Sequence, residues 1–187
     1  MRQIPTSLLT LLLLAGPAFG QAEPPRAREA VTTEEVGSFV VLTLFNPGTV
    51  PACAITGPMT SAFRMRLYLD RAGDASVDLI NTAWALTRGA KATVTFKTAD
   101  RTATRAFAVQ DGSSATTVLH TFLPASDPAR DAVLGLARAA FTTGTATDLA
   151  FADGQAYRFA GPPAEAAAAF QRCMALVTRE VAFPASR

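Results

Sequence analysis

Short runs of alternating apolar and polar residues, separated by turn residues, follow one another through most of this chain. In FRMRLYLD, residues 63–70, apolar side chains occupy every second position, with two arginines and a tyrosine between them. Successive side chains of a strand point to opposite faces of a sheet, so this alternation is typical of a strand with one buried face. Five further runs are strand-like: 38–45, 76–80, 92–97, 103–110 and 116–123. This series of short strands predicts an antiparallel β-sandwich or a partly open barrel.

The last third of the chain changes to the period of a helix. In residues 127–141, Asp127 is placed to cap a helix whose apolar positions recur every three or four residues. An alanine-rich segment, 162–177, has the same period and carries Cys173 on its apolar face. Between the two, an aspartate–glycine pair in residues 148–160 predicts a hairpin. The predicted fold class is therefore α+β, mainly β, with two late helices.

The first 22 residues have the layout of a secretory signal peptide. Arg2 precedes an apolar run at residues 8–15, and small residues follow at the expected cleavage site after residue 20 or 22. The apolar run is far shorter than the roughly 20 residues that span a bilayer, so a retained membrane anchor is the weaker alternative. We therefore predict an exported, periplasmic protein with no transmembrane segment in the mature chain.

The remaining sequence divides by composition into three parts. Residues 23–37 are polar and poor in large apolar side chains, which predicts a flexible lead. Residues 38–180 contain all the strand and helix patterns and are predicted to form a single β-rich domain, followed by a tail at 181–187. This length is ordinary for one domain with a sizeable hydrophobic core.

The chain contains two cysteines, Cys53 and Cys173. Export brings a protein into an oxidising compartment, where two cysteines most simply form a disulfide bond. Two buried free thiols, an intermolecular bridge and a metal-binding pair are the alternatives. The metal pair is disfavoured because the chain has one histidine and no CxxC spacing. We predict that the bridge clamps the last helix to a loop that carries Cys53.

The charge of the chain is nearly balanced, with 17 basic and 15 acidic residues and a formal net charge of +2 at pH 7. Such a small excess gives no general field that would attract nucleic acid or an anionic membrane, so neither partner is expected. The sequence has no phosphate-binding loop and no GxGxxG pattern, and we expect no nucleotide cofactor or metal ion.

A candidate binding surface is formed by Arg64, Arg66 and Tyr68, which share the polar face of one predicted strand. Lys97 and Arg105 are expected on neighbouring strands, and such a basic face suits an acidic partner. The alternative is a solvated outer face that protects against aggregation. Trp84, the single tryptophan, is a further candidate for binding, and core packing is the alternative interpretation.

Evidence for catalysis is sparse in the sequence. His120, the only histidine, shares a face with Val118 and Phe122, so an inward orientation is one interpretation of the pattern. It is a candidate general base, and the alternative is a hydrogen-bonded residue of the sheet. No GxSxG nucleophile motif accompanies it, and Ser113 and Ser114 lie in a turn-like DGSS segment.

Aspartates are the other catalytic candidates. Asp70, Asp74 and Asp78 recur at a spacing of four, and Asp148 and Asp153 flank the predicted hairpin. Paired carboxylates serve in glycoside hydrolysis, but aspartates also stabilise turns. A calcium loop is not complete at Asp70, since the later ligands and the closing glutamate are missing.

The order of these parts resembles a group of exported bacterial proteins. A loop cysteine in PACAIT, a strand with Trp84, a hairpin ending at Gly161 and an alanine-rich helix with Cys173 carry the resemblance. The pattern is similar to small uncharacterised periplasmic proteins of proteobacteria, some of them loosely related to the invasion-associated locus B family. It covers most of residues 38–177, but the early tryptophan of that family is replaced by phenylalanine. The resemblance implies a fold and a compartment, and no catalytic residue.

Three functional hypotheses follow from the sequence. The first is an exported non-enzymatic envelope protein that binds or buttresses another protein. The second is a periplasmic inhibitor or small-ligand-binding module, and the third is a hydrolase that uses His120 or a pair of aspartates. The sequence leaves the oligomeric state open.

Overall fold

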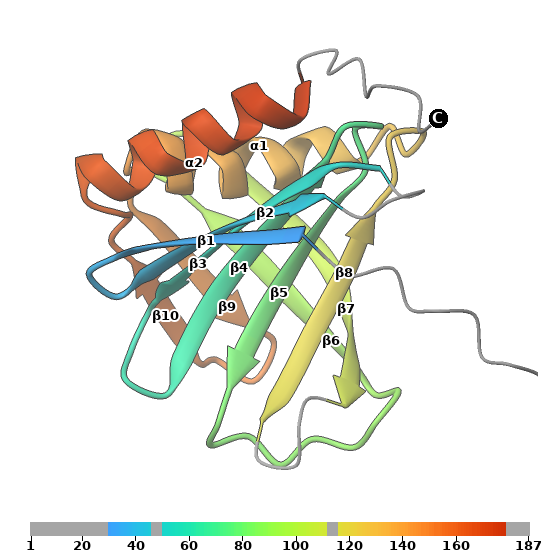
Figure 1. The fold of residues 1–187 in the computed structure, drawn as a ribbon. Helices are drawn as coiled ribbons and strands as arrows, with labels where there is room; N and C mark the ends of the chain where they lie inside the picture. Colours follow the sequence, from blue (N-terminus) through green and yellow to red (C-terminus); the bar gives the residue numbers. More distant parts are fainter. Residues whose placement is uncertain (1–29, 46–49, 112–115, 179–187) are drawn as a thin grey trace, which may run out of the picture.

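The computed structural model describes residues 30–45, 50–111 and 116–178, and these contain ten strands and two helices (Figure 1). The predicted signal peptide at 1–22, the first part of the predicted lead and the predicted tail at 181–187 lie outside the described residues. Each alternating run found in the sequence, including 63–70, forms a strand. The fold is α+β and mainly β, as predicted.

The strands are β1 Ala30–Val36, β2 Phe39–Phe45, β3 Ala52–Pro58, β4 Phe63–Asp70, β5 Ala75–Asn81, β6 Lys91–Lys97, β7 Thr102–Asp111, β8 Thr117–Leu123, β9 Thr147–Phe151 and β10 Ala156–Phe159. The helices are α1 Arg130–Thr142 and α2 Ala164–Thr178. No helix in the described part of the chain is long and apolar enough to cross a membrane.

All ten strands belong to one antiparallel sheet, in the order β1-β2-β3-β4-β5-β8-β7-β6-β9-β10. The sheet does not close, because β1 and β10 remain its two edges. It bends strongly, however, so that its last strand faces its early ones. Phe159 of β10 contacts Phe39 of β2 with ring centroids 6.2 Å apart, and Tyr157 contacts Phe63 of β4 at 4.6 Å. The two halves of the sheet are thus two facing walls.

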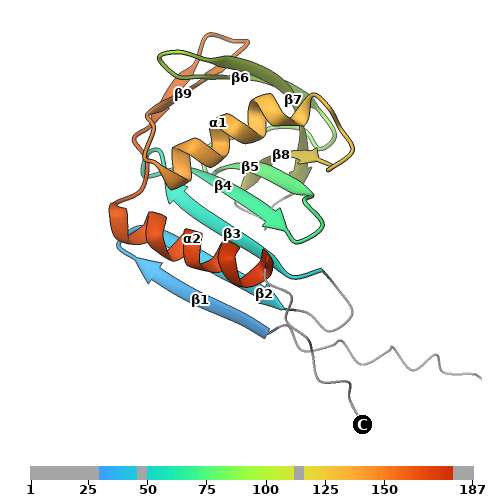
Figure 2. The same cartoon turned by 90° about the horizontal axis from the view of Figure 1, so that it is seen from above.

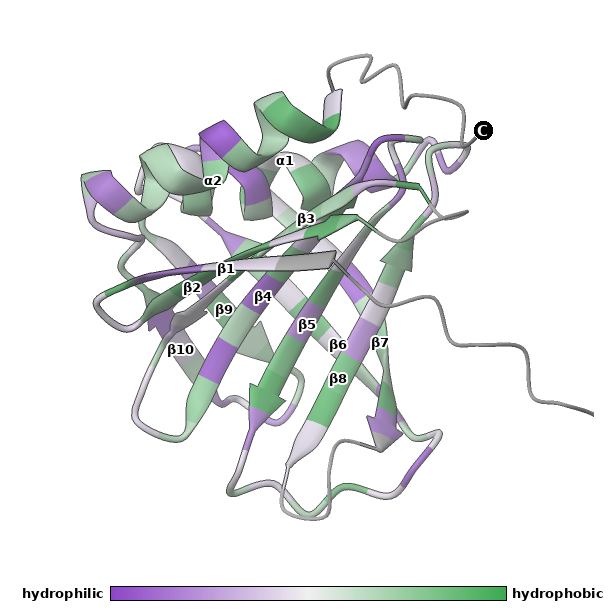
Figure 3. Ribbon diagram, in the orientation of Figure 1, coloured by the Kyte–Doolittle hydropathy of each residue, from purple (hydrophilic) through white to green (hydrophobic). Residues whose placement is uncertain are grey.

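The apolar residue of each alternating pair points between the walls, and Figure 3 shows the resulting alternation along β4. One row of buried cross-strand neighbours runs through β2, β3, β4 and β5, namely Val41, Ile55, Leu67 and Val77. The helices cover one end of the space between the walls, and α1 lies between β4–β5 and β6–β7 when the fold is seen from above (Figure 2). Phe141 of α1 packs against Phe159 and Phe170.

The predicted disulfide is present. Cys53 and Cys173 are bonded, with their Cα atoms 5.9 Å apart, and both are buried. The bridge joins α2 to β3, and the Thr43 hydroxyl of β2 donates a hydrogen bond to the sulfur of Cys173 at 3.0 Å. The prediction that Cys53 lies in a loop was wrong. The neighbouring prolines suggested a loop, but Pro51 precedes β3 and Pro58 is its last residue, so neither interrupts the strand.

The prediction of a flexible lead at 23–37 was also wrong for its second half. Residues 30–36 form β1, which pairs along its whole length with β2. As an edge strand β1 needs few large apolar residues, which is why its sequence resembles a lead. Glu34 of β1 accepts a hydrogen bond from Arg172 of α2 at 2.6 Å.

Asp127 does not cap α1 as the sequence suggested. The helix begins at Arg130, and Ala129 stands at the N-cap without a side-chain hydrogen bond. Asp127 instead accepts hydrogen bonds from the backbone N–H of Ala129 at 2.9 Å and from Arg105 of β7 at 2.7 Å. The partner on β7, distant in sequence, fixes this carboxylate outside the helix.

Gly161 precedes α2 and packs against Gly144, which follows α1. Its φ of +84° lies in the left-handed region, where residues other than glycine are strained. A Cβ atom at Gly161 would lie 2.6 Å from the Cα of Gly144. This contact lets the two segments that enter and leave the β9–β10 hairpin approach closely.

We predict that Cys53→Ala/Cys173→Ala lowers the free energy of unfolding by about 4–5 kcal/mol, because the bridge closes a long loop in the unfolded chain. Urea denaturation of the variant and of the oxidised wild type measures this difference. Wild type kept reduced throughout refolding should match the variant. Equal stability of the variant and the oxidised protein would contradict the prediction.

A matched pair of glycine variants tests the contact between Gly161 and Gly144. Gly161→Ala should lower the free energy of unfolding by at least about 2 kcal/mol, since it combines backbone strain with a steric clash. Gly135→Ala in α1 meets no atom within 4 Å and should raise it by about 0.5–1 kcal/mol. The midpoint of thermal unfolding should fall in Gly161→Ala and rise in Gly135→Ala. A change in the same direction in both variants would refute the predicted clash at Gly161.

Candidate functional site

An aromatic cluster lies between the walls at the end away from the helices. Trp84, in the segment after β5, contacts Phe63 with ring centroids 5.0 Å apart and Phe151 of β9 at 5.3 Å. Tyr157 of β10 completes the cluster and lies 4.6 Å from Phe63. The backbone carbonyl of Trp84 accepts a hydrogen bond from Thr117 of β8 at 2.7 Å, which fixes the segment against the wall.

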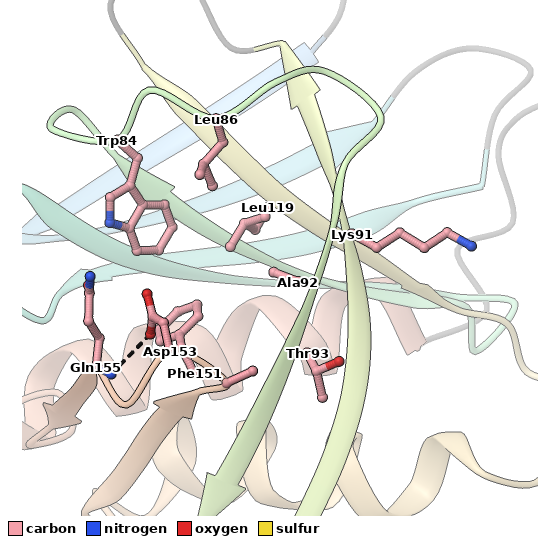
Figure 4. A pocket seen from close by; sticks show the side chains of 10 residues that line it. Trp84, Leu86, Lys91, Ala92, Thr93, Leu119, Phe151, Asp153 and Gln155 are labelled. Carbon is pink, nitrogen blue, oxygen red and sulfur yellow. Dashed lines mark hydrogen bonds between the residues drawn. The ribbon is translucent and has the colours of Figure 1, made fainter.

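A pocket opens beside this cluster (Figure 4). We call it the inner pocket, and it has a volume of about 340 Å³. Leu119 of β8 is almost fully buried there, whereas Leu86 at the mouth is 45% exposed. The residues that line it are Trp84, Leu86, Lys91, Ala92, Thr93, Leu119, Phe151, Ala152, Asp153 and Gln155.

The inner pocket suits an uncharged apolar group. Its volume lies within the range of pockets that hold small molecules, and aromatic and aliphatic side chains form much of its lining. The ammonium group of Lys91 points away from Trp84 (Figure 4), and Asp153 is held at the β9–β10 turn by the backbone N–H of Gln155 at 3.0 Å. The charges of the lining therefore lie at its rim, with Lys91 directed outward and Asp153 at the turn.

A charged row crosses the outer face of the sheet on β4, β5 and β8. Arg66 of β4, Asp78 of β5 and His120 of β8 are cross-strand neighbours in register. The Nε of Arg66 donates to Oδ2 of Asp78 at 2.7 Å, and Nδ1 of His120 lies 2.6 Å from Oδ1 of the same carboxylate. The side chain of Asp78 is only 5% exposed, whereas those of Arg66 and His120 are 40% and 26% exposed.

This row forms part of a second hollow, which we call the outer pocket. Its volume is also about 340 Å³. It is polar on one side and aliphatic on the other, and its lining consists of Leu42, Leu44, Ala54, Arg66, Tyr68, Ser76, Asp78, Gln110 and His120. Burial, followed by the nearby carboxylates of Asp70 and Asp74, raises the pKa of the Tyr68 phenol above its ordinary value.

The structure separates the residues of the predicted binding surface. Arg66 and Tyr68 line the outer pocket, whereas Trp84 belongs to the inner one. Arg64 lies on the same face as Arg66, but it donates a hydrogen bond to the backbone carbonyl of Ser38 at 2.8 Å. Arg105 was expected nearby and instead pairs with the carboxylate before α1.

The inward interpretation of His120 was wrong, and the residue is hydrogen-bonded on the outer face of the sheet. On β8, Leu119 and Thr121 are buried between the walls, and His120 and Phe122 face outward. The run TTVLHTFL has apolar residues in both registers, so its alternation does not identify the inner face. The pairing of His120 with Asp78, 42 residues away, left no local signal in the sequence.

Two side chains of the outer pocket are arranged like part of a catalytic triad. Asp78 holds His120 as an orienting carboxylate holds a general base, and Ser76 lines the same pocket. Within the described part of the chain, however, no hydrogen bond joins Ser76 to His120. Ser113 and Ser114 lie outside the described residues.

The remaining candidate aspartates have partners of their own, away from His120. Asp70 accepts a hydrogen bond from the backbone N–H of Asp74 at 2.8 Å, and Asp74 accepts one from Ala125 at 2.7 Å. Asp148 lies 3.8 Å from Arg158, and Asp153 is part of the hairpin turn. Among the residues that the structure describes, no group of three metal-ligating side chains comes together.

Comparison of the chain with family models, curated proteins and solved structures found no match. The resemblance to proteins related to the invasion-associated locus B family therefore stays a prediction.

The environment of Tyr68 predicts an alkaline titration. In Tyr157→Phe, Tyr68 is the only tyrosine, and its absorbance change should have a midpoint above the ordinary value of 10.0. The folded state holds this proton more tightly than the unfolded chain, so the stability that it contributes is present at neutral pH and is lost as the pH rises past that value. A midpoint at or below the ordinary value would contradict the prediction.

Proposed function

We propose that this protein is an exported, non-enzymatic binding protein of the periplasm, and that its inner pocket holds an uncharged apolar small molecule. The observation that carries the proposal is the pocket beside Trp84, Phe151 and Leu119, open to solvent at the end of the fold that the helices do not cover. A preformed apolar cavity with a few polar groups at its rim is the usual form of a small-molecule site.

The compartment is proposed from the sequence. Residues 1–22 have the layout of a signal peptide. The disulfide between Cys53 and Cys173 is compatible with an oxidising compartment, since such bonds are rare in reducing ones.

Two observations favour a small ligand over a partner protein. Among the residues that the structure describes, the exposed large apolar side chains come from separate segments, namely Val50, Leu86, Phe122 and Leu176. Single apolar residues of this kind are normal on a monomer surface. Two arginines of the predicted basic face are also paired with carboxylates, Arg66 with Asp78 and Arg105 with Asp127.

The single tryptophan makes the proposal directly testable. N-phenyl-1-naphthylamine, an uncharged apolar fluorophore, should quench the emission of Trp84 as its own emission rises, because both rings would lie in one pocket. Leu86→Asp should weaken this binding by roughly tenfold, since a charge replaces apolar surface at the mouth.

Leu176→Asp on α2 is the matched control, because Leu176 is 47% exposed and Leu86 is 45% exposed. The control should bind the fluorophore as the wild type does. Binding that leaves the emission of Trp84 unchanged, or that is equally strong in Leu86→Asp, would refute the proposed site.

A further inference from the structure

The outer pocket contains three charged or titratable side chains, Arg66, Asp78 and His120, whose net charge depends on whether His120 is protonated. Asp78 is almost fully buried and carries both Arg66 and His120 on its two oxygens. With neutral His120, the guanidinium and the carboxylate cancel. With protonated His120, the same three side chains carry one net positive charge at the surface of the pocket.

The hydrogen bonds of this group leave further donors for a ligand. Asp78 is an acceptor, so Nδ1 of His120 carries a proton, and Nε2 has a free lone pair when the ring is neutral and an N–H when it is charged. Within the described part of the chain, Nε2 of His120 and Nη1 of Arg66 have no partner. The Tyr68 hydroxyl lines the same pocket and adds a neutral donor.

The other titratable groups around His120 favour an anion. Asp78 of β5 is the acidic group against it, and Arg66 and Tyr68 of β4 are nearby in the outer pocket. On its other side, His120 borders a different hollow, together with Lys91 of β6 and Arg105 of β7. Arg105 is paired with Asp127. Protonation of His120 therefore creates positive charge beside Arg66 and Lys91.

An aliphatic surface lies within the same pocket. Leu42, Leu44 and Ala54 of β2 and β3 line it together with His120 of β8. In a flat sheet, β2 and β8 would be four strands apart, or roughly 19 Å. Side chains from both strands nevertheless line one pocket. A single ligand can therefore contact the polar and the aliphatic sides together.

We propose that the outer pocket is a proton-linked site for an amphipathic carboxylate. The carboxylate would lie between Arg66 and protonated His120, and its aliphatic chain would cover Leu42, Leu44 and Ala54. Charge-assisted hydrogen bonds hold the head group, and loss of the His120 proton removes both a donor and the net positive charge. The site therefore binds its ligand more tightly when His120 is protonated than when it is neutral.

The single histidine reports on this site. In tag-free exported protein, the imidazole signals of His120 can be followed by NMR as the pH is changed, alone and with octanoate. Octanoate should raise the pH midpoint by about one unit if it binds the protonated form tenfold more tightly. Acetate has the same charge without the chain and should give a smaller shift. The uncharged 1-octanol should give none.

Each arm can overturn part of the proposal. No shift with octanoate would overturn it, as would octanoate binding that changes only the emission of Trp84 in the inner pocket. A shift with acetate as large as that with octanoate would refute the aliphatic subsite. An equal shift with 1-octanol would refute the anion site.

Two variants with matched controls localise the effect. Leu42→Ser leaves the charged row intact and should reduce the octanoate shift to that of acetate, whereas Leu176→Ser on α2 should not. Arg66→Gln should abolish the shift, whereas Arg64→Gln, on the same face of β4, should retain it. An octanoate shift that survives Leu42→Ser refutes the placement of the chain, even if Arg66→Gln proves unstable. The result is independent of the inner pocket, which Trp84 reports separately.

Discussion

The packing of the last strand against the first ones determines the form of this protein. The edges of the sheet, β1 and β10, do not pair with each other, so no ladder of hydrogen bonds closes the structure. Side-chain packing of Phe159 and Tyr157 against Phe39 and Phe63 holds the two walls together instead. Burial of these large rings removes much apolar surface from water, which compensates for the ordering of a long, curved sheet.

The helices connect the two walls at one end. In one wall, α2 contacts β1, β2 and β3, and in the facing wall, α1 contacts β6, β7 and β9. Phe141 and Phe170 join the helices to each other. The disulfide fixes α2 to β3, so it stabilises the connection between the walls as well as a single helix. The opposite end lacks such a cover in the described residues, and there the aromatic cluster borders the inner pocket.

Local patterns predicted most of this fold from the sequence. Alternation at 63–70 and the aspartate–glycine turn of the hairpin are short-range signals, and the strands formed as expected. The errors arose where long-range contacts decide the structure. The edge strand β1 is stabilised by pairing with β2 and not by its own composition, and Asp127 is held by Arg105 of a distant strand. The bend that brings β10 against β2 and β4 has no local signature either.

The candidate sites were less accessible to sequence reasoning, because each depends on which face a residue of β8 occupies. Leu119 borders the inner pocket, and His120, the next residue, borders the outer one. A shift of one residue in the register of β8 would exchange these faces. It would bring the histidine between the apolar walls and separate it from Asp78. The pairing of β8 with β5 on one side and β7 on the other prevents this shift. The strand pairing that positions the core residues of β8 therefore also keeps the apolar pocket and the charged pocket on opposite faces of the sheet.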